Sequence, residues 1–316
     1  MATKRRPVHG VLLLDKPLGW SSNDILQKVK WLLRAEKAGH TGTLDPLASG
    51  VLPLCFGAAT KFSQLQLDAD KTYEATVLLG IQTSTGDAEG AIIAERPVHV
   101  TDADIARVAM QFTGAIQQTP PMHSALKKDG KALYEYARAG IEVAREARPV
   151  TIHSLAMELT PNPAVTPVDT ARPAIKMIVR CSKGTYIRTL GEDLGEALGC
   201  GAHLSRLRRI GTGGFSIAQC VTLETLEAMS EEERGAYLLP VDSLLEHHTT
   251  VTLDADNAAR FLNGLARRGD WADAAQVAVY AAQSGSLLGT AHIQHHELIP
   301  KRLLSPLEIE QIMKKL

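Results

Sequence analysis

Alternating apolar and polar side chains predict several strands. In residues 71–80, the side chains of Tyr73, Ala75, Val77 and Leu79 fall on one face, as in a strand with one buried side. Similar strand character is found at residues 8–14, 175–181, 276–282 and 287–293. The last two stretches flank a small polar turn at residues 284–286, so we expect them to form a hairpin.

Other segments repeat apolar residues every three or four positions, which predicts helices with one buried face. The first helix follows the capping stretch Ser21-Ser22-Asn23 and aligns apolar side chains from Ile25 to Leu33. Further helices are predicted at residues 102–112, at residues 190–198 and at residues 254–265. Because strands and helices do not alternate strictly, we predict an α+β fold rather than a doubly wound sheet.

Three segments interrupt this pattern. Residues 37–50 read as a loop. Pro120 and Pro121 forbid a continuing helix, and the stretch that follows, residues 121–149, is rich in Lys and Arg and contains Tyr134 and Tyr136. It could lie against a nucleic-acid backbone or form a helical hairpin at the surface. A domain boundary is predicted near residues 240–250, so the tail is expected to be a small separate module.

The composition is that of an ordinary globular protein, with 45% hydrophobic and 22% charged residues among 316. The longest apolar runs, such as residues 11–14, fall far short of the roughly 18 residues of a membrane span. The basic N-terminus lacks the apolar core of a signal peptide, so we expect a cytoplasmic protein. Four widely spaced cysteines without a C-x-x-C pair indicate neither a disulfide framework nor a zinc ribbon.

The net charge of −1 at pH 7 does not favour indiscriminate binding to nucleic acid. Basic residues nevertheless gather at positions 127–131, 176–188 and 206–209, whereas acidic residues gather at positions 224–233. This segregation permits a basic face on a neutral protein, although a solvated surface without a partner fits equally well.

One glycine-rich loop, residues 39–50, contains a single carboxylate, Asp45. An Asp-Pro pair commonly begins a turn, and an Asp at this place could simply cap the next segment. Elsewhere, His292, His295 and His296 form a histidine cluster, but without matching Cys residues it does not indicate a metal site. Residues 80–90 contain no phosphate-binding glycine pattern.

The loop resembles the catalytic motif of pseudouridine synthases, in which G-x-L-D is followed by a short spacer and G-[VLM]-L. The matching stretches are Gly42-Thr43-Leu44-Asp45 and Gly50-Val51-Leu52. More motifs resemble the TruB branch of that family, in the same order along the chain. They are Asp15-Lys16-Pro17, Ser21-Ser22-Asn23-Asp24, Ala59-Thr60-Lys61, Lys71-Thr72-Tyr73, Ser124-Ala125-Leu126-Lys127, Lys183-Gly184-Thr185-Tyr186-Ile187-Arg188, Gly201-Ala202-His203-Leu204 and Leu207-Arg208-Arg209.

The resemblance implies a reaction and a catalytic set. Turning uridine into pseudouridine breaks the N1–C1′ bond, rotates the base and joins C5 to C1′, which requires no redox cofactor, ATP or metal. Asp45 would be the nucleophile, attacking C1′ or C6, and Arg188 would pair with it. An ordinary Asp, with a pKa of about 3.9, is ionised at pH 7, and an adjacent guanidinium favours the charged form. Tyr73 would stack on the target base and move its last proton.

The resemblance also implies residues that bind the substrate. The uridine must leave its stack, which costs a few kcal/mol, while base–aromatic stacking returns about 1–3 kcal/mol per base. Tyr186, like Tyr73, would stack on the flipped base, and His40 would fill the space that the base leaves in the RNA. Leu207 would line an apolar pocket, and Lys16 would contact the substrate. His123 departs from the family pattern, which commonly has Tyr there, and this puts one RNA contact in doubt.

The fold implied is a mixed, mostly antiparallel sheet in residues 1–245 with a thumb-like insertion at about 118–152. A PUA-like RNA-binding domain would follow in residues 246–316. The expected partner is the T stem-loop of tRNA, modified at uridine 55, without a guide RNA, and we expect a monomer. Three rivals remain: an RNA-binding module without catalysis, a guide-dependent synthase, and a glycoside hydrolase, which usually requires two carboxylates.

Overall fold

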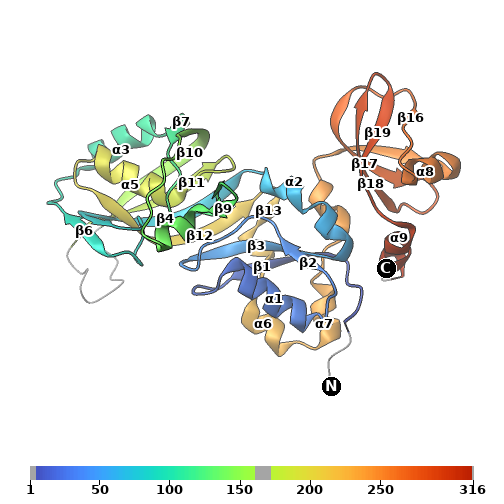
Figure 1. Cartoon of the computed structure of the whole chain (residues 1–316), viewed down its shortest axis with the longest axis horizontal. Coiled ribbons are helices and arrows are strands. Elements are labelled where there is room, and N and C mark those ends of the chain that lie inside the picture. Colours follow the sequence, from blue (N-terminus) through green and yellow to red (C-terminus); the bar gives the residue numbers. More distant parts are fainter. Residues whose placement is uncertain (1–4, 161–171, 315–316) are drawn as a thin grey trace.

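A single twisted sheet organises most of the chain in the computed structural model, which describes residues 5–160 and 172–314 (Figure 1). Most neighbouring strands are antiparallel, but β1 pairs with β14, and β3 with β12, in parallel. This mixed sheet confirms the predicted α+β class. Its order is β14 (Val221–Thr222), β1 (Gly10–Lys16), β3 (Ala48–Phe56), β12 (Ala202–Thr212), β4 (Lys71–Leu79), β11 (Ala174–Cys181), β10 (Arg148–Thr160) and β7 (Gly114–Gln118), with β2 (Ala38–His40) beside β3 and β13 (Phe215–Ser216) beside β12.

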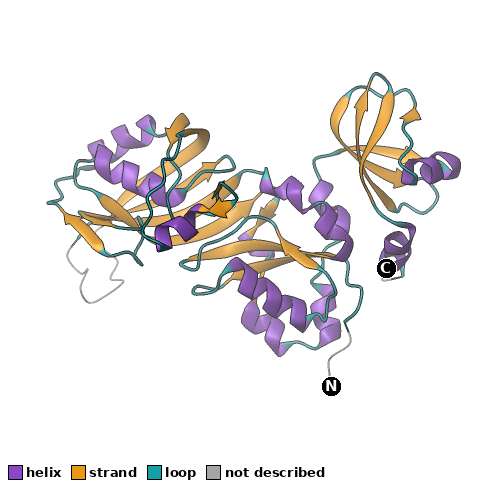
Figure 2. Ribbon diagram, viewed as in Figure 1, coloured by secondary structure: helices purple, strands orange, loops and turns teal. Residues whose placement is uncertain are grey.

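The two faces of this sheet are buried by different partners. Successive side chains of a strand point to opposite faces. In β1, therefore, Leu12 and Leu14 join the main hydrophobic core, while Val11 and Leu13 join a second one. Four helices contribute apolar side chains to the main core: α1 (Ser22–Leu32), α3 (Asp102–Gln111), α5 (Ile187–Ala197) and α6 (Leu223–Ala228). Figure 2 shows helices in purple beside the strands of the large sheet in orange.

The C-terminal residues form a separate five-stranded sheet that packs onto the second core. Ala278, Leu287 and Leu304 of this module share that core with Val11 and Leu13 of β1. The strand order is β15 (Thr249–Leu253), β17 (Ala274–Ala281), β18 (Leu287–Gln294), β19 (Glu297–Leu303) and β16 (Arg267–Arg268), accompanied by α8 (Ala255–Leu262) and α9 (Pro306–Met313). None of the helices in the described ranges is long and apolar enough to cross a membrane.

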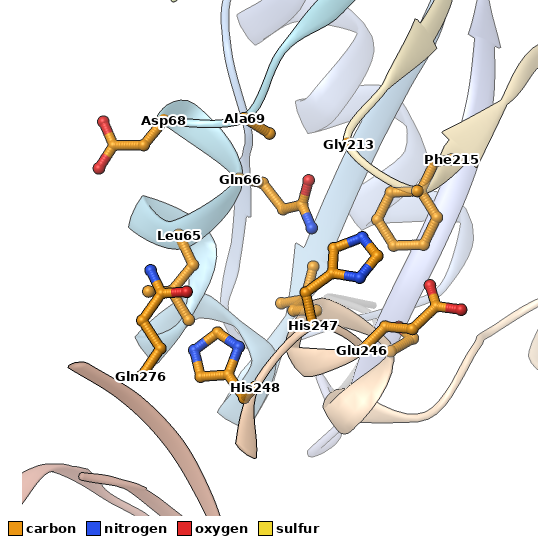
Figure 3. Close-up of a pocket in the computed structure, with 13 residues that line it drawn as sticks. Leu65, Gln66, Asp68, Ala69, Gly213, Phe215, Glu246, His247, His248 and Gln276 are labelled. Atoms are coloured by element: carbon orange, nitrogen blue, oxygen red, sulfur yellow. The ribbon is translucent and has the colours of Figure 1, made fainter. Parts of the chain in front are cut away.

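A cavity of about 200 Å³ lies where the two parts of the chain meet, between α2 (Ser63–Leu67), the turn after β12 and the 3₁₀ helix η3 (Val241–Leu245). Figure 3 shows Gln66, His247 and Phe215 around it, with Gln276 of β17 at its edge. None of the predicted site residues lines this cavity.

The local predictions hold best where the periodicity is longest. Helices α3 and α8 and strands β4, β11, β17 and β18 lie where the sequence predicts them. The loop predicted at residues 37–50 is wrong at both ends, because β2 pairs with β3 and β3 already begins at Ala48. The sequence did not indicate this pairing. Strand β2 has only three residues, and β3 is buried at nearly every position, so neither shows an alternation of apolar and polar side chains.

The basic insertion does not form a helical hairpin, which was one of the two alternatives that the sequence left open. Strand β7 ends at Gln118 and β10 begins at Arg148, so residues 119–147 lie outside the main sheet, and the predicted limit of 152 falls within a strand. The insertion contains only the hairpin of β8 (Lys127–Lys128) and β9 (Lys131–Ala132) and one short helix, α4 (Leu133–Arg138). The remaining short elements are the 3₁₀ helices η1 (Gly57–Lys61) and η2 (Ile217–Gln219), the hairpin β5 (Ile81–Thr83) and β6 (Ile92–Glu95), and α7 (Glu231–Ala236).

Candidate active site

Asp45 lies in the short loop, residues 41–47, that joins β2 to β3. The buried hydroxyl of Ser22, the first residue of α1, both accepts a hydrogen bond from the Leu44 amide (2.8 Å) and donates one to the Leu44 carbonyl (2.9 Å). The Gly19 amide donates to the Pro46 carbonyl at 2.8 Å. The loop is thus fixed on both sides of Asp45, whose side chain remains 41% exposed.

Arg188, in the first turn of α5, holds this carboxylate. Its Nη2 lies 3.0 Å from Asp45 Oδ2, and the Arg188 side chain is only 8% exposed. The same guanidinium donates to the carbonyl of His123 at 2.6 Å, and its Nη1 lies 3.2 Å from Asp87 Oδ2. The pairing that the family resemblance implies is therefore present. Since His123 contributes its backbone here, this contact is independent of its side chain.

Asp87 is a member of the site that the sequence did not reveal. Its side chain is 3% exposed, and Oδ1 accepts hydrogen bonds from the Thr85 hydroxyl (2.6 Å) and the Glu89 amide (3.1 Å). Arg188 therefore bridges one buried and one accessible carboxylate, and only Asp45 of the two can meet a substrate. In the sequence, an Asp that follows Gly86 is typical of a turn. Only its contact with Arg188 in the folded chain shows that Asp87 belongs to the site.

Tyr73 lies on β4, half-buried against the main core. Burial raises the pKa of Tyr73, and the charge of Arg209, with a side-chain hydrogen bond to it, opposes this increase. Asp45 is close enough to raise this pKa further. The hydroxyl thus lies within electrostatic reach of both the carboxylate and a buried guanidinium.

Lys16 is not placed as a substrate contact, which corrects the sequence-based prediction. Its side chain is fully buried, and Nζ donates to the carbonyls of Trp20 (2.7 Å) and Pro17 (3.0 Å). Burial lowers the pKa of Lys16 to about 8, although the charge of Asp45 acts in the opposite direction. Lys16 therefore fixes the turn beside the Asp45 loop, and its charge lies beneath the site.

The other predicted binding residues lie on or beside three different elements, β2, α5 and β12. His40 ends β2 with a buried Nδ1 that has no partner among the described residues, and burial lowers its pKa. Tyr186 precedes α5, where its backbone exchanges two hydrogen bonds with the Gln118 side chain. Leu207 of β12 is 9% exposed and borders a cavity of about 1040 Å³ that Pro46 and Leu47 also line. Among the described residues, no cluster of three His, Cys, Asp or Glu is placed to hold a metal ion.

A half-buried acid beside this network, Glu192, makes stability depend on pH. Burial and the charge of Asp193 raise the pKa of Glu192 from 4.5 to about 7. Because the folded state holds this proton more tightly than the unfolded state, the stability it contributes is lost as pH rises through about 7. We expect Glu192→Gln to raise the free energy of unfolding by about 1–2 kcal/mol at about pH 8, with little change at about pH 5.

Urea denaturation at the two pH values measures this difference. Glu142→Gln, at an exposed position, is the matched control and should change neither value. An equal effect of Glu192→Gln at both pH values would show that packing, not ionisation, is responsible.

Comparison with known families matches the chain almost from end to end. The model of the TruB family pseudouridylate synthase N-terminal domain matches residues 30–187. Those of the tRNA pseudouridylate synthase B C-terminal domain and of the pseudouridine synthase II TruB C-terminal domain match residues 188–246 and 249–304.

Named relatives agree with these matches. The chain is 64% identical over 314 residues to tRNA pseudouridine synthase B of Verminephrobacter eiseniae, covering 98% of this chain and 93% of the relative. It is 58% identical over 305 residues to the protein of that name from Ralstonia nicotianae, covering 95% of each. Among solved structures, a Cbf5-Nop10-Gar1 complex contains a chain with 27% identity and a TM-score of 0.68, covering 95% of this chain and 86% of that one.

Proposed function

The chain belongs to the TruB family of pseudouridylate synthases, and from this we propose that it modifies the uridine at position 55 in the T loop of tRNA. It is an isomerase that converts uridine to pseudouridine in tRNA. The observation that carries the proposed mechanism is the ion pair of Asp45 with Arg188, at 3.0 Å, on the accessible side of a buried charge network.

Asp45 acts as the nucleophile. Its carboxylate attacks C1′ or C6 of the flipped uridine, the N1–C1′ bond breaks, and the base rotates until C5 bonds to C1′ as the bond to Asp45 is released. Arg188 keeps the carboxylate ionised and aimed when the base covers it. Since the buried Asp87 holds Arg188 from behind, the guanidinium does not have to reorient during the reaction.

Aromatic and apolar groups receive the flipped base. Tyr73 stacks on it and handles its last proton, Tyr186 adds a second aromatic surface, and Leu207 forms an apolar wall. His40 fills the space that the base leaves in the RNA. The lowered pKa of His40 favours its neutral form, which suits insertion among bases.

The proposal assigns catalysis to residues 1–245, with residues 119–147 as the thumb, and RNA binding to residues 246–316 as a PUA-like domain. The enzyme works as a monomer in the cytoplasm and recognises the T stem-loop directly. The extended basic insertion, whose His123 carbonyl accepts a hydrogen bond from Arg188, supports direct contact with tRNA rather than use of a guide RNA.

Purified protein and an unmodified tRNA transcript, with no other RNA present, test this function. We expect a carbodiimide-dependent stop of reverse transcription at one site in the T loop. A stop elsewhere would refute the substrate position, and a stop only after addition of a second RNA would indicate guide dependence. Release of free uracil would identify a glycoside hydrolase.

A further inference from the structure

Among the described residues, Arg209 of β12 is the largest fully buried side chain, at 1% exposure. In the part of the chain that the structure describes, no carboxylate lies within ion-pair distance of it. Its Nε donates to the Val51 carbonyl at 2.7 Å, and its Nη2 donates to the Gly42 carbonyl at 3.3 Å. A buried guanidinium that has only neutral acceptors is costly, which calls for an explanation.

The neighbours of Arg209 increase this cost. The ammonium groups of Lys16 and Lys71 are also buried, and both donate only to backbone carbonyls. Burial lowers the pKa of each lysine to about 8, and the charge of Arg209 lowers it further. Arg209 thus lies within electrostatic reach of two further buried cations. An excess of buried positive charge stabilises a negative charge that forms beside it.

Tyr73 is the group on which this charge can form. Strand β12 lies between β3 and β4, and its register places Arg209 directly opposite Tyr73 on one side and Gly50 on the other. Directly opposite residues of paired strands point to the same face. The Tyr73 hydroxyl lies within electrostatic reach of the Arg209 guanidinium. Because a guanidinium can only donate, the Tyr73 oxygen is the acceptor toward Arg209, and its own proton stays available for the base.

We propose that Arg209 is a positioning residue that holds the Tyr73 hydroxyl toward the base and stabilises its phenolate during the final proton transfer. Its guanidinium also ties Gly42, in the loop that carries Asp45, to Val51 of β3. The proposal rests on the proposed function, since it assigns a partner to the residue that moves the last proton.

The proton transfer balances without an external reagent. Once C5 has bonded to C1′ and Asp45 has been released, the ring carries one proton on C5 and lacks one on N1. The Tyr73 hydroxyl gives its proton to N1, and the resulting phenolate takes the proton from C5. The electron pair of the C5–H bond restores the ring double bond, and Tyr73 is neutral again.

Three charged or titratable side chains lie near Tyr73. Arg209 comes from β12, Asp45 from the loop before β3, and Cys181 from β11. Burial raises the pKa of Cys181 to about 11, so this thiol is neutral at pH 7. Asp45 disfavours the phenolate, which leaves Arg209 as the group that favours it.

The test first removes the charge of Arg209 and then makes the phenol at position 73 more acidic by fluorination. We expect Arg209→Gln to reduce the single-turnover rate by about 10²-fold while the tRNA dissociation constant changes by less than about threefold. Fluorotyrosine introduced at position 73 reports its own ionisation by ¹⁹F NMR, and its pKa should rise by at least about one unit in the variant. Because fluorinated phenols are more acidic, this replacement should also recover at least about tenfold of the lost rate.

Two further variants keep the test decisive. Arg209→Met replaces the buried charge with an apolar chain of similar length, which proteins often tolerate, and serves if the Gln variant does not fold. Arg208→Gln is the matched control, since Arg208 points to the opposite face and pairs with Asp15 at 2.6 Å. The control should leave the fluorotyrosine pKa unchanged.

An unchanged fluorotyrosine pKa in the Arg209 variants, or a rate loss that fluorination does not reduce, would overturn the proposal and leave Arg209 as a structural tie. A wild-type protein that forms no pseudouridine would instead overturn the proposed function. The two failures are therefore distinguishable.

Discussion

Replacing Asp45 by Asn is expected to reduce pseudouridine formation by at least about 10⁴-fold, equivalent to about 5.5 kcal/mol of activation free energy. The amide has nearly the same shape but cannot act as the nucleophile. Folding should hardly change, by about 0–1 kcal/mol, because the Asp45 side chain is 41% exposed and Arg188 keeps its buried partner. Single-turnover assays and urea denaturation measure the two effects.

The matched control is Asp68→Asn. Asp68 forms an ion pair with Lys183 at 2.7 Å on the surface, with a side chain that is 55% exposed. It should retain wild-type activity. An Asp45→Asn enzyme that remains within about tenfold of the wild type would exclude Asp45 as the nucleophile.

Replacing Arg188 by Gln is expected to damage both stability and catalysis. The change leaves Asp87, 3% exposed, without its cationic partner, and breaking a buried pair in this way costs about 3–5 kcal/mol. It also removes the cation beside Asp45, so the rate should fall by about 10²–10³-fold. Denaturation curves and single-turnover rates should therefore both change, unlike those of the Asp45 variant.

A second substitution separates the two effects. Adding Asp87→Asn to Arg188→Gln removes the unpaired buried charge, so the double variant should regain much of the lost stability while its rate stays as low as that of Arg188→Gln. If the double variant is no more stable than Arg188→Gln, the buried pair does not account for the loss. If it regains activity, Arg188 does not act on Asp45.

Local patterns predicted much of this structure because they depend on neighbouring residues. The alternation around Tyr73 predicted β4, and apolar spacing predicted α3 and α8. The site was predicted by the order of the motifs that resemble the family. Asp45 alone reads as a turn residue, and its partner Arg188 lies 143 positions further along the chain.

Properties that depend on distant pairing could not be predicted from the sequence. Lys16 belongs to a matching motif, but only the buried turn shows that its ammonium binds backbone carbonyls. Asp87 has no local pattern that distinguishes it from a turn residue. Arg209 was part of a quoted motif, yet its neighbours are defined by the insertion of β12 between β3 and β4.

The position of β12 also determines when the active site can form as the chain is synthesised. Strand β3 ends at Phe56 and β4 at Leu79, but the strand that joins them comes from residues 202–212. At Gly50 a side chain would lie 2.1 Å from the Arg209 carbonyl, so this junction closes tightly and only around glycine. Pairings this distant in sequence form slowly. The nascent chain therefore carries its nucleophile long before the strand that completes the active-site framework has been synthesised.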